Sequence, residues 1–257
     1  MKKLIISLLF GVVSQFVIAA PTQCPQHFVA GQAPTITNKT MTNQALDLCY
    51  LGFAVVNSGL TRGPLYSAEH LTRDRIIQAQ ALKRVDSFHA ETAIPANQRG
   101  ELSDYVRSGY DRGHMAPNKD MSDSEMQYQS FSLANIVPQD PDNNRNLHAD
   151  IENATRVMAK KYGEVYVITG PAFMGSTWQK IGNVAVPTNI WKAVYVPSLN
   201  IAGVYWEKNA PGYEYEIITV NELSARVGMD IFPGLPANIK TQKVDMPRPV
   251  AASSYRE

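Results

Sequence analysis

Four short runs along the chain carry the apolar, β-branched and aromatic residues that are typical of β-strands. The run EVYVIT meets a Gly-Pro pair at 170–171, and such a pair predicts the end of a strand. The other runs are punctuated by polar or turn-forming residues. The expected strands therefore span residues 50–56, 164–169, 193–196 and 202–206.

Two segments follow a helical period instead. In residues 143–162 the side chains of Leu147, Ile151, Ala154 and Met158 recur at helical spacing and form one apolar stripe. Residues 221–227 are followed by Gly228, a typical helix stop. Strands and helices are mixed without strict alternation, which favours an α+β fold over a doubly wound parallel sheet.

The start of the chain has a different pattern. Lys2 and Lys3 precede an apolar run that ends at small residues near Ala19, as in a secretory signal peptide. An uncleaved membrane anchor is the alternative, but the run is shorter than the ~20 residues that a bilayer requires. We therefore expect a periplasmic or secreted protein, not held in a membrane after cleavage. Its expected parts are a signal peptide at 1–19, an N-terminal arm at 20–44, one domain at 45–240 and a loose tail at 241–257.

The chain contains two cysteines, Cys24 and Cys49, both near the expected mature N-terminus. In an oxidising compartment such a pair is expected to form one disulfide, which would fix the N-terminal arm. A catalytic thiol is the alternative, but neither cysteine lies in a recognisable nucleophile motif.

Composition and charge exclude few functions. With 44% hydrophobic residues and a formal charge of +1, the chain is neither disordered nor marked as a nucleic-acid or membrane binder by its charge. The balance is uneven locally, because residues 62–84 contain five basic and two acidic side chains. We expect this segment to form a basic surface.

The sequence GYDRGHMAP at 109–117 brings an acid, a base and a histidine close together. Gly113 is expected to allow a tight turn that exposes His114. The other histidines at 27, 70 and 89 are interpreted as surface or packing residues, whereas His148 is left open because it lies on the helix described next.

Polar residues follow at regular intervals. Asn144, His148, Glu152 and Arg156 recur every four residues, so on the expected helix they form one polar stripe. A solvated helix face would have the same pattern, and an asparagine in the first turn can be merely a cap. Asn135 lies between the histidine motif and this helix.

Together these residues resemble the DNA/RNA non-specific endonucleases, which are ββα-metal (His-Me finger) nucleases. The resemblance rests on DRGHMAP at 111–117 and on the spacing from His114 to Asn135, Asn144 and Glu152. It continues through YVITGP at 166–171, VPTNIWK at 186–192 and VGMDIFP at 227–233. It implies a central, mostly antiparallel sheet flanked by helices and carrying the ββα-metal motif.

The resemblance also implies roles for individual residues. His114 would be the general base that activates water, and Asn144 would be the one direct protein ligand of a Mg²⁺ ion, for which Mn²⁺ could substitute. Glu152 would hold metal-bound waters, Arg112 would contact the phosphate, and Asn135 would support the site.

Substrate contacts are less well defined by the sequence. Arg156 is a candidate for the phosphate side, and the family uses an upstream arginine for which Arg84 and Arg99 are both candidates. We found no element that would read base edges, so DNA and also RNA are expected as substrates with little sequence preference. A salt bridge to Asp111 or another acid is the alternative role for Arg112.

Two other functions compete with the nuclease. One is a catalytically silent nucleic-acid-binding protein on the same fold, which the intact His114, Asn144 and Glu152 disfavour. The other is a zinc hydrolase, which lacks support because the chain has no HExxH motif or compact cluster of metal ligands. Whether the protein is a monomer or a homodimer is left open.

Overall fold

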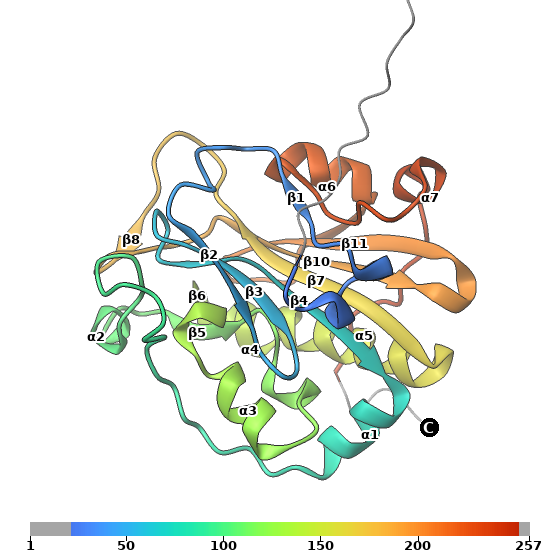
Figure 1. The fold of residues 1–257 in the computed structure, drawn as a ribbon, viewed down its shortest axis with the longest axis horizontal. Coiled ribbons are helices and arrows are strands. Elements are labelled where there is room, and N and C mark those ends of the chain that lie inside the picture. The colour runs from blue at the N-terminus through green and yellow to red at the C-terminus, as the bar shows by residue number, and fades with distance from the viewer. Residues whose placement is uncertain (1–21, 252–257) are drawn as a thin grey trace, which may run out of the picture.

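A seven-stranded antiparallel sheet forms the centre of the protein, as a computed structural model that describes residues 22–251 shows (Figure 1). Its strands run in the order β12-β11-β10-β7-β4-β3-β2. The expected signal peptide at 1–19 lies outside the described residues. The strands are β2 (Ala45–Cys49), β3 (Ala54–Ser58), β4 (Gly63–Thr72), β7 (Glu164–Ala172), β10 (Asn189–Val196), β11 (Ile201–Lys208) and β12 (Tyr215–Ile218).

Helices cover both faces of this sheet. In Figure 1, α6 (Val220–Val227) and α7 (Ala237–Thr241) lie above it, and α1 (Arg73–Ala81) and α3 (Ser124–Ser130) lie below it. The long helix α5 (Leu147–Tyr162) packs against β7 on the same face as α1. The expectation of an α+β fold with a mostly antiparallel sheet flanked by helices is therefore confirmed.

Strand alternation sends side chains into two separate cores. On β10, Trp191 and Ala193 join the cluster beneath α6 and α7, whereas Val194 and Val196 join the cluster beneath α5. Because both faces are covered, the central strands are apolar on both sides. Most of these strands are longer than the sequence pattern predicted, because the pattern detected only their most apolar parts.

The expected strand end at Gly170-Pro171 is wrong, because β7 continues through both residues and pairs with β10. A Cβ atom on Gly170 would lie 2.5 Å from the Trp191 ring and 2.6 Å from the Leu65 carbonyl. Gly170 is therefore needed for close packing within the sheet. The expected strand at 50–56 begins instead at Ala54.

The expected helix at 143–162 is two helices. Asn146 has φ −117° and ψ −89°, which separates α4 (Pro141–Arg145) from α5. The second expected helix is confirmed as α6, and Gly228 ends it in the left-handed conformation with φ 66°. The remaining short elements are α2 (Leu102–Tyr105), β1 (Thr35–Ile36), β5 (Asp111–His114), β6 (Ile136–Gln139), β8 (Lys180–Ile181), β9 (Val184–Ala185) and β13 (Met229–Asp230).

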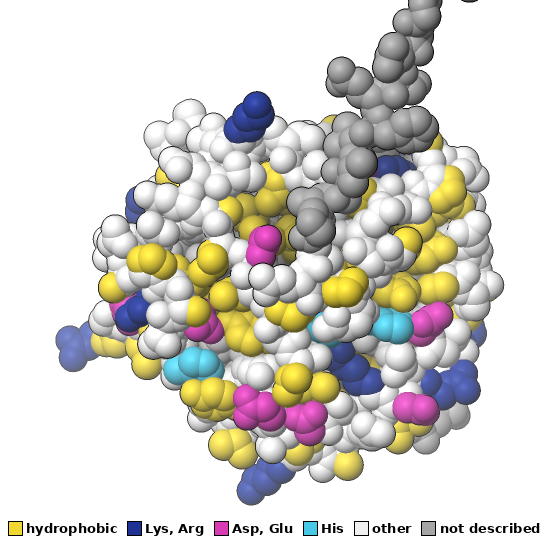
Figure 2. Space-filling view, viewed as in Figure 1, with side chains coloured by type: hydrophobic (Ala, Val, Ile, Leu, Met, Phe, Trp, Pro, Cys, Tyr) yellow, Lys and Arg dark blue, Asp and Glu magenta, His cyan; other side chains and the backbone are white. Residues whose placement is uncertain are grey.

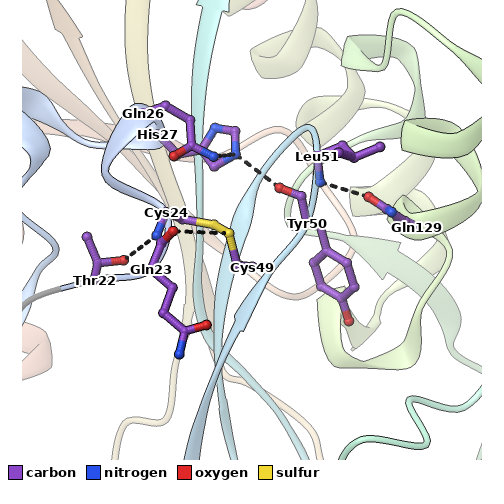
Figure 3. Close-up of a disulfide and its surroundings, with 9 residues drawn as sticks. All are labelled: Thr22, Gln23, Cys24, Gln26, His27, Cys49, Tyr50, Leu51 and Gln129. Atoms are coloured by element: carbon purple, nitrogen blue, oxygen red, sulfur yellow. Dashed lines mark hydrogen bonds between the residues drawn. A yellow bond between two sulfur atoms is a disulfide. The ribbon is translucent and has the colours of Figure 1, made fainter.

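The N-terminal segment is attached to the sheet by a disulfide, as the sequence predicted. Cys24 and Cys49 are bonded with a Cα–Cα distance of 5.6 Å (Figure 3). Close by, His27 Nε2 contacts the Tyr50 carbonyl oxygen at 3.2 Å. Cys24 and Phe28 are buried in the core beneath α6, and β1 pairs with β13. The described residues of this segment, 22–44, thus pack as part of the same folded unit.

The described part of the C-terminal segment also packs against the sheet, in contrast to the loose tail that we expected from residue 241 on; residues 252–257 of that tail lie outside the described residues. Met246 is 9% exposed and lies against Gly203 of β11. The Tyr205 hydroxyl donates a hydrogen bond of 2.7 Å to the Pro247 carbonyl. In the part of the chain that the structure describes, no helix is both long and apolar enough to cross a membrane.

Candidate active site

The histidine motif lies in a small ββα unit at the edge of the α5 face. Strand β5 pairs antiparallel with β6, so His114 lies opposite Ile136 and Gly113 lies opposite Val137. Helix α4 follows at once, and the Asp140 side chain caps it by accepting hydrogen bonds from the amides of residues 142 and 143. Two strands and a helix thus bring His114 and Asn144 into one compact element.

The sequence predicted an exposed His114, but the structure buries it. The side chain is only 8% accessible and lies between two aromatic rings. The ring centroids of Phe88 and Phe131 lie 5.3 Å and 5.0 Å from the imidazole. Among the described residues, Nε2 has no hydrogen-bond partner. The histidine is therefore held mainly by packing.

Gly113 has a different function from the tight turn that we expected. It lies within β5, and a Cβ atom there would be 1.9 Å from Gln139 Oε1 and 2.6 Å from Gln139 Cβ. The absent side chain allows Gln139 of the paired strand to cross over this position. Gln139 Nε2 in turn donates a 2.6 Å hydrogen bond to Asn143 Oδ1.

The environment of His114 favours its neutral form. Burial is the largest cause that lowers the pKa of His114 to about 3. The guanidinium charges of Arg84 and Arg112 lower it further, as does the neighbouring His148. The Asp86 carboxylate opposes this effect. His114 is therefore unprotonated at neutral pH.

Asn135 holds the backbone that follows His114. Its Oδ1 accepts hydrogen bonds from the Ala116 amide at 2.9 Å and from the Ser67 hydroxyl at 2.7 Å. Its Nδ2 donates to the carbonyls of Ala116 and Ser130. The asparagine thus joins β4 to the backbone that follows His114.

Asn144 lies beside the first residue of the motif. Its Nδ2 donates a 2.9 Å hydrogen bond to Asp111 Oδ2, and Arg145 donates two bonds of 2.8 Å to the same carboxylate. Burial raises the pKa of Asp111, but the bonds from Arg145 and Asn144 outweigh it, so the pKa is lowered overall. Asp111 is therefore paired with Arg145, whereas the Arg112 guanidinium lies over the Phe88 ring.

Arg112 and Arg84 both lie over aromatic rings that contact His114. The Arg112 guanidinium carbon is 4.1 Å from the centre of the Phe88 ring, and that of Arg84 is 5.3 Å from the centre of the Phe131 ring. Both side chains are exposed. Each cation is thus oriented by an aromatic face while it stays accessible.

The structure separates the two candidates for the upstream arginine. Arg84 donates to the Asp86 carboxylate at 2.5 Å and lies close enough to His114 to lower its pKa. Arg99 instead donates to the Glu101 carboxylate at 2.8 Å and to the Ile94 carbonyl at 3.0 Å. Of the two, Arg84 is the one that the fold brings to His114.

The structure does not support the expectation that Arg156 contacts substrate. Its guanidinium is buried and donates to Asp120 Oδ1 at 2.9 Å and to Asn153 Oδ1 at 2.6 Å. Glu152 lies between this arginine and His148, with oxygens 3.7 Å and 3.6 Å from them. The side of α5 that carries these residues faces the sheet, so the expected polar stripe is largely a buried one.

Sequence reasoning missed the charged side chains that the sheet directs toward α5. Glu69 of β4, Lys192 of β10 and Glu207 of β11 are each buried although they lie in otherwise apolar strands. Glu207 Oε1 contacts His148 Nδ1 at 2.5 Å, and its Oε2 accepts a 3.1 Å bond from Asn143. The sequence signal that could have found them is a single charged residue within an otherwise apolar strand run.

The expected basic surface at 62–84 does not form as a unit. Arg75 is turned inward and donates to the carbonyls of Asp120 and His70. Arg73 donates to the Lys160 carbonyl, and Arg84 is the member of this segment whose charge acts on His114. On the face shown in Figure 2, basic side chains are scattered among acidic ones.

Comparisons agree with this α+β fold and its ββα unit. EndoG, in a crystal structure of its complex with EndoGI, superimposes with a TM-score of 0.68 at 24% identity, covering 75% of this chain and 88% of EndoG. Residues 31–238 match the family model for DNA/RNA non-specific endonuclease. The chain belongs to the DNA/RNA non-specific endonuclease family.

Relatives of this chain include nucleases from several organisms. Nuclease EXOG, mitochondrial, of Danio rerio is 31% identical over 196 residues, 68% of this chain and 57% of that protein. Nuclease C1 of Cunninghamella echinulata is 39% identical over 145 residues, 51% of this chain and 58% of that protein. A nuclease of Nostoc is 33% identical over 185 residues, 63% and 66% of the two chains. This chain spans about half the length of several of the relatives it matches.

Proposed function

We propose that this protein is an exported, Mg²⁺-dependent endonuclease that hydrolyses phosphodiester bonds in DNA and RNA with little sequence preference. The observation that carries the proposal is the position of His114. It is a neutral imidazole between two aromatic rings, each of which also carries an exposed arginine.

His114 is the general base in this proposal. A base must be unprotonated to accept a proton from water, and burial keeps His114 in that form. The same arginines that lower its pKa would bind a phosphate, whose negative charge cancels theirs. Substrate binding therefore raises the basicity of His114 when water is to be deprotonated.

Arg112 and Arg84 bind the scissile phosphate and stabilise the negative charge that grows on it. Stacking on Phe88 and Phe131 restricts both guanidinium groups before substrate arrives, so less conformational entropy is lost on binding. Asn135 does not touch the substrate; it holds the backbone after His114 in place.

Asn144 fits the role of a Mg²⁺ ligand. Its amide nitrogen is engaged by Asp111, which leaves Oδ1, an oxygen of the kind that Mg²⁺ prefers, for the ion. When bound there, Mg²⁺ would act as a Lewis acid toward the phosphate and the leaving oxygen. Glu152 would accept hydrogen bonds from the ion's waters, and its small exposed fraction of 13% fits contact with ordered water.

Little sequence preference is expected because the groups around His114 are suited to phosphate rather than to base edges. A silent nucleic-acid-binding protein would retain the arginines, but it would have no need of a neutral histidine beside them. A catalytic zinc centre has no support: within residues 22–251, no group of three histidine, cysteine or acidic side chains could hold a metal.

Export is proposed from the N-terminal sequence pattern and from the disulfide, because disulfides persist in oxidising compartments. Proteolytic mapping of the mature N-terminus after expression would test it. A protein that retains residues 1–19 in the cytoplasm would contradict this part of the proposal.

The decisive experiment is digestion of plasmid DNA and of RNA with Mg²⁺, with EDTA, and with His114→Ala. Loss of a general base typically slows a reaction by about 10²–10⁴-fold, so we expect at least a hundredfold fall in kcat. His89→Ala is the matched control, because His89 stacks on Tyr128 and is outside the proposed mechanism. If wild-type protein leaves both polymers intact, the nuclease proposal fails.

A further inference from the structure

A pocket beside the histidine motif has no part in the mechanism proposed above. Its volume is about 210 Å³. Pockets for drug-sized molecules usually measure about 300–1,000 Å³, so this one has room for a single ring system rather than for a longer molecule. Its walls are formed by Leu102, Tyr105, Val106, Tyr110, Asp111 and Arg112.

Two of these walls belong to the candidate active site. Arg112, whose guanidinium lies over Phe88, is the proposed phosphate ligand. Asp111 accepts a hydrogen bond from Asn144, the proposed Mg²⁺ ligand, and Arg145 offsets the charge of this carboxylate. A strand whose phosphate contacts Arg112 would therefore bring an adjoining nucleoside to the pocket.

The remaining walls suit a nucleobase. Tyr105 and Tyr110 are aromatic, and the apolar residues Leu102 and Val106 are 41% and 67% exposed. Every base has a π-face, so a pocket that binds by stacking accepts all of them. Such a pocket is consistent with cleavage that has little sequence preference.

The pocket is formed before any ligand binds. Asp104 fixes α2, because Oδ2 accepts a 2.8 Å bond from the Glu101 amide and Oδ1 accepts a 2.9 Å bond from the Asn183 amide. Tyr105 belongs to a buried apolar cluster, and Tyr110 packs against the same cluster. Walls that are already ordered lose little conformational entropy when a ligand binds.

The loop that leads into the motif also carries an exposed cation. Arg107 directly follows Val106, and its φ of 56° is a left-handed conformation that arginine rarely adopts. Gly109 has a φ of 82°, and a Cβ atom there would meet nothing within 4 Å. The loop thus turns sharply and places a positive charge next to the wall formed by Val106, where it can contact the following phosphate of a bound strand.

We propose that this pocket is a subsite for the nucleoside next to the scissile phosphate, with its base against the Tyr110 ring and the Val106 side chain. This inference rests on the proposed function and extends it, because the enzyme would recognise a phosphate together with one neighbouring base. A paired base must leave the duplex stack before it can enter. Unpaired nucleosides are therefore expected to fill the pocket more readily.

The first test uses single-stranded DNA oligonucleotides in which one ordinary phosphodiester stands among slowly cleaved phosphorothioate linkages. One form has every base, and two forms carry an abasic residue immediately 5′ or 3′ of the ordinary bond. We expect loss of the base on one of these sides to lower kcat/KM about 5–150-fold, the range for a base stacked on an aromatic side chain. Equal rates for the three forms would overturn the proposal.

Variants of the walls assign this effect to the pocket. Tyr110→Leu and Val106→Ser should bring the ratio of the rates on the complete and abasic forms closer to one. Tyr195→Leu is the matched control: Tyr195 is also partly buried against an apolar cluster, and its hydroxyl donates to Asn200 Oδ1 at 3.0 Å, as Tyr110 donates to Gln179 Oε1 at 3.3 Å. A Tyr110 variant that keeps the wild-type ratio would contradict the assignment.

The second test measures binding without cleavage. On a His114→Ala background with EDTA, the complete oligonucleotide should bind at least fivefold more tightly than the sensitive abasic form, and Tyr110→Leu should remove the difference. Equal affinities on the His114→Ala background would overturn the subsite. If the wild-type protein cuts no nucleic acid but the difference in affinity is present, the nuclease proposal fails and the subsite stands. If it cuts at rates that do not depend on the base, the subsite alone fails.

Discussion

At the scale of single residues, the site depends on aromatic rings that hold charged and titratable groups in place. Phe88 and Phe131 contact His114 on two sides, and each ring also lies beneath an arginine. Packing of this kind fixes the imidazole without giving its Nε2 a hydrogen-bond partner. The residue whose environment matters most is thus positioned by neighbours that carry no charge.

Arg84 and Arg99 offer a direct comparison at this scale. Arg84→Ala should raise KM for DNA and reduce the slope of log affinity against log salt by about 0.9, the value for one phosphate contact on duplex DNA. Arg99→Ala should leave that slope unchanged, because the Arg99 side chain is only 20% exposed and also donates to the Ile94 carbonyl, whereas Arg84 is 49% exposed beside its partner Asp86. Binding measured on a His114→Ala background over a range of salt concentrations checks both. The same slope change in both variants would argue against the assignment.

At the scale of elements, the pairing of β5 with β6 determines where His114 lies. Gly113 sits opposite Val137, and the side chain of Gln139 passes over it to reach Asn143. Asn146 then breaks the helical path and allows α4 to stay with the hairpin while α5 packs on the sheet. The ββα unit is therefore joined to the main sheet through polar side chains as well as apolar packing.

Gly113→Ala tests this crossing of Gln139. The new methyl group would lie within 2.6 Å of Gln139 Cβ, which cannot rotate away, so we expect about 3 kcal/mol of destabilisation, as for overpacked cores. Gly63→Ala is the control, since its Cβ would meet only the Ile136 carbonyl at 3.4 Å. Urea unfolding of the two variants measures the difference. A Gly113 variant as stable as the control would show that β5 and β6 can separate at no cost.

At the scale of the whole molecule, buried histidines link stability to pH. Burial lowers the pKa of His27 to about 4, as it lowers that of His114 to about 3. Below pH 6.5 each histidine becomes protonated in the unfolded chain, but in the folded protein it stays neutral until the pH falls to its lowered pKa. Their contribution to stability is complete above pH 6.5 and is lost as the pH falls toward 3.

His114→Gln isolates one of these groups. Between pH 7.5 and pH 5 the wild-type protein should lose about 2 kcal/mol more free energy of unfolding than the variant, because a single histidine with this shift accounts for that amount. Urea denaturation at the two pH values gives the comparison. Equal losses would mean that His114 is protonated in the folded protein at pH 5.

The sequence by itself determined the α+β class, the disulfide and the family, because those follow from local patterns and from a motif of closely spaced residues. It also selected His114 and Asn144, which the short ββα unit carries on β5 and α4. It could not decide which way Arg156, Arg75 or the tail would face. Orientation relative to the sheet depends on packing between distant segments, and the local pattern does not record it.

Tertiary structure alone brought Glu207 of β11 to His148 of α5, 59 residues apart in the chain. It also separated Arg84 from Arg99 as neighbours of His114. A charged residue in an apolar strand can be placed only when its partner across the core is known, since burial of a charge requires that partner. The sequence thus determined which chemical groups are present, and the packing of the sheet decided which of them come into contact.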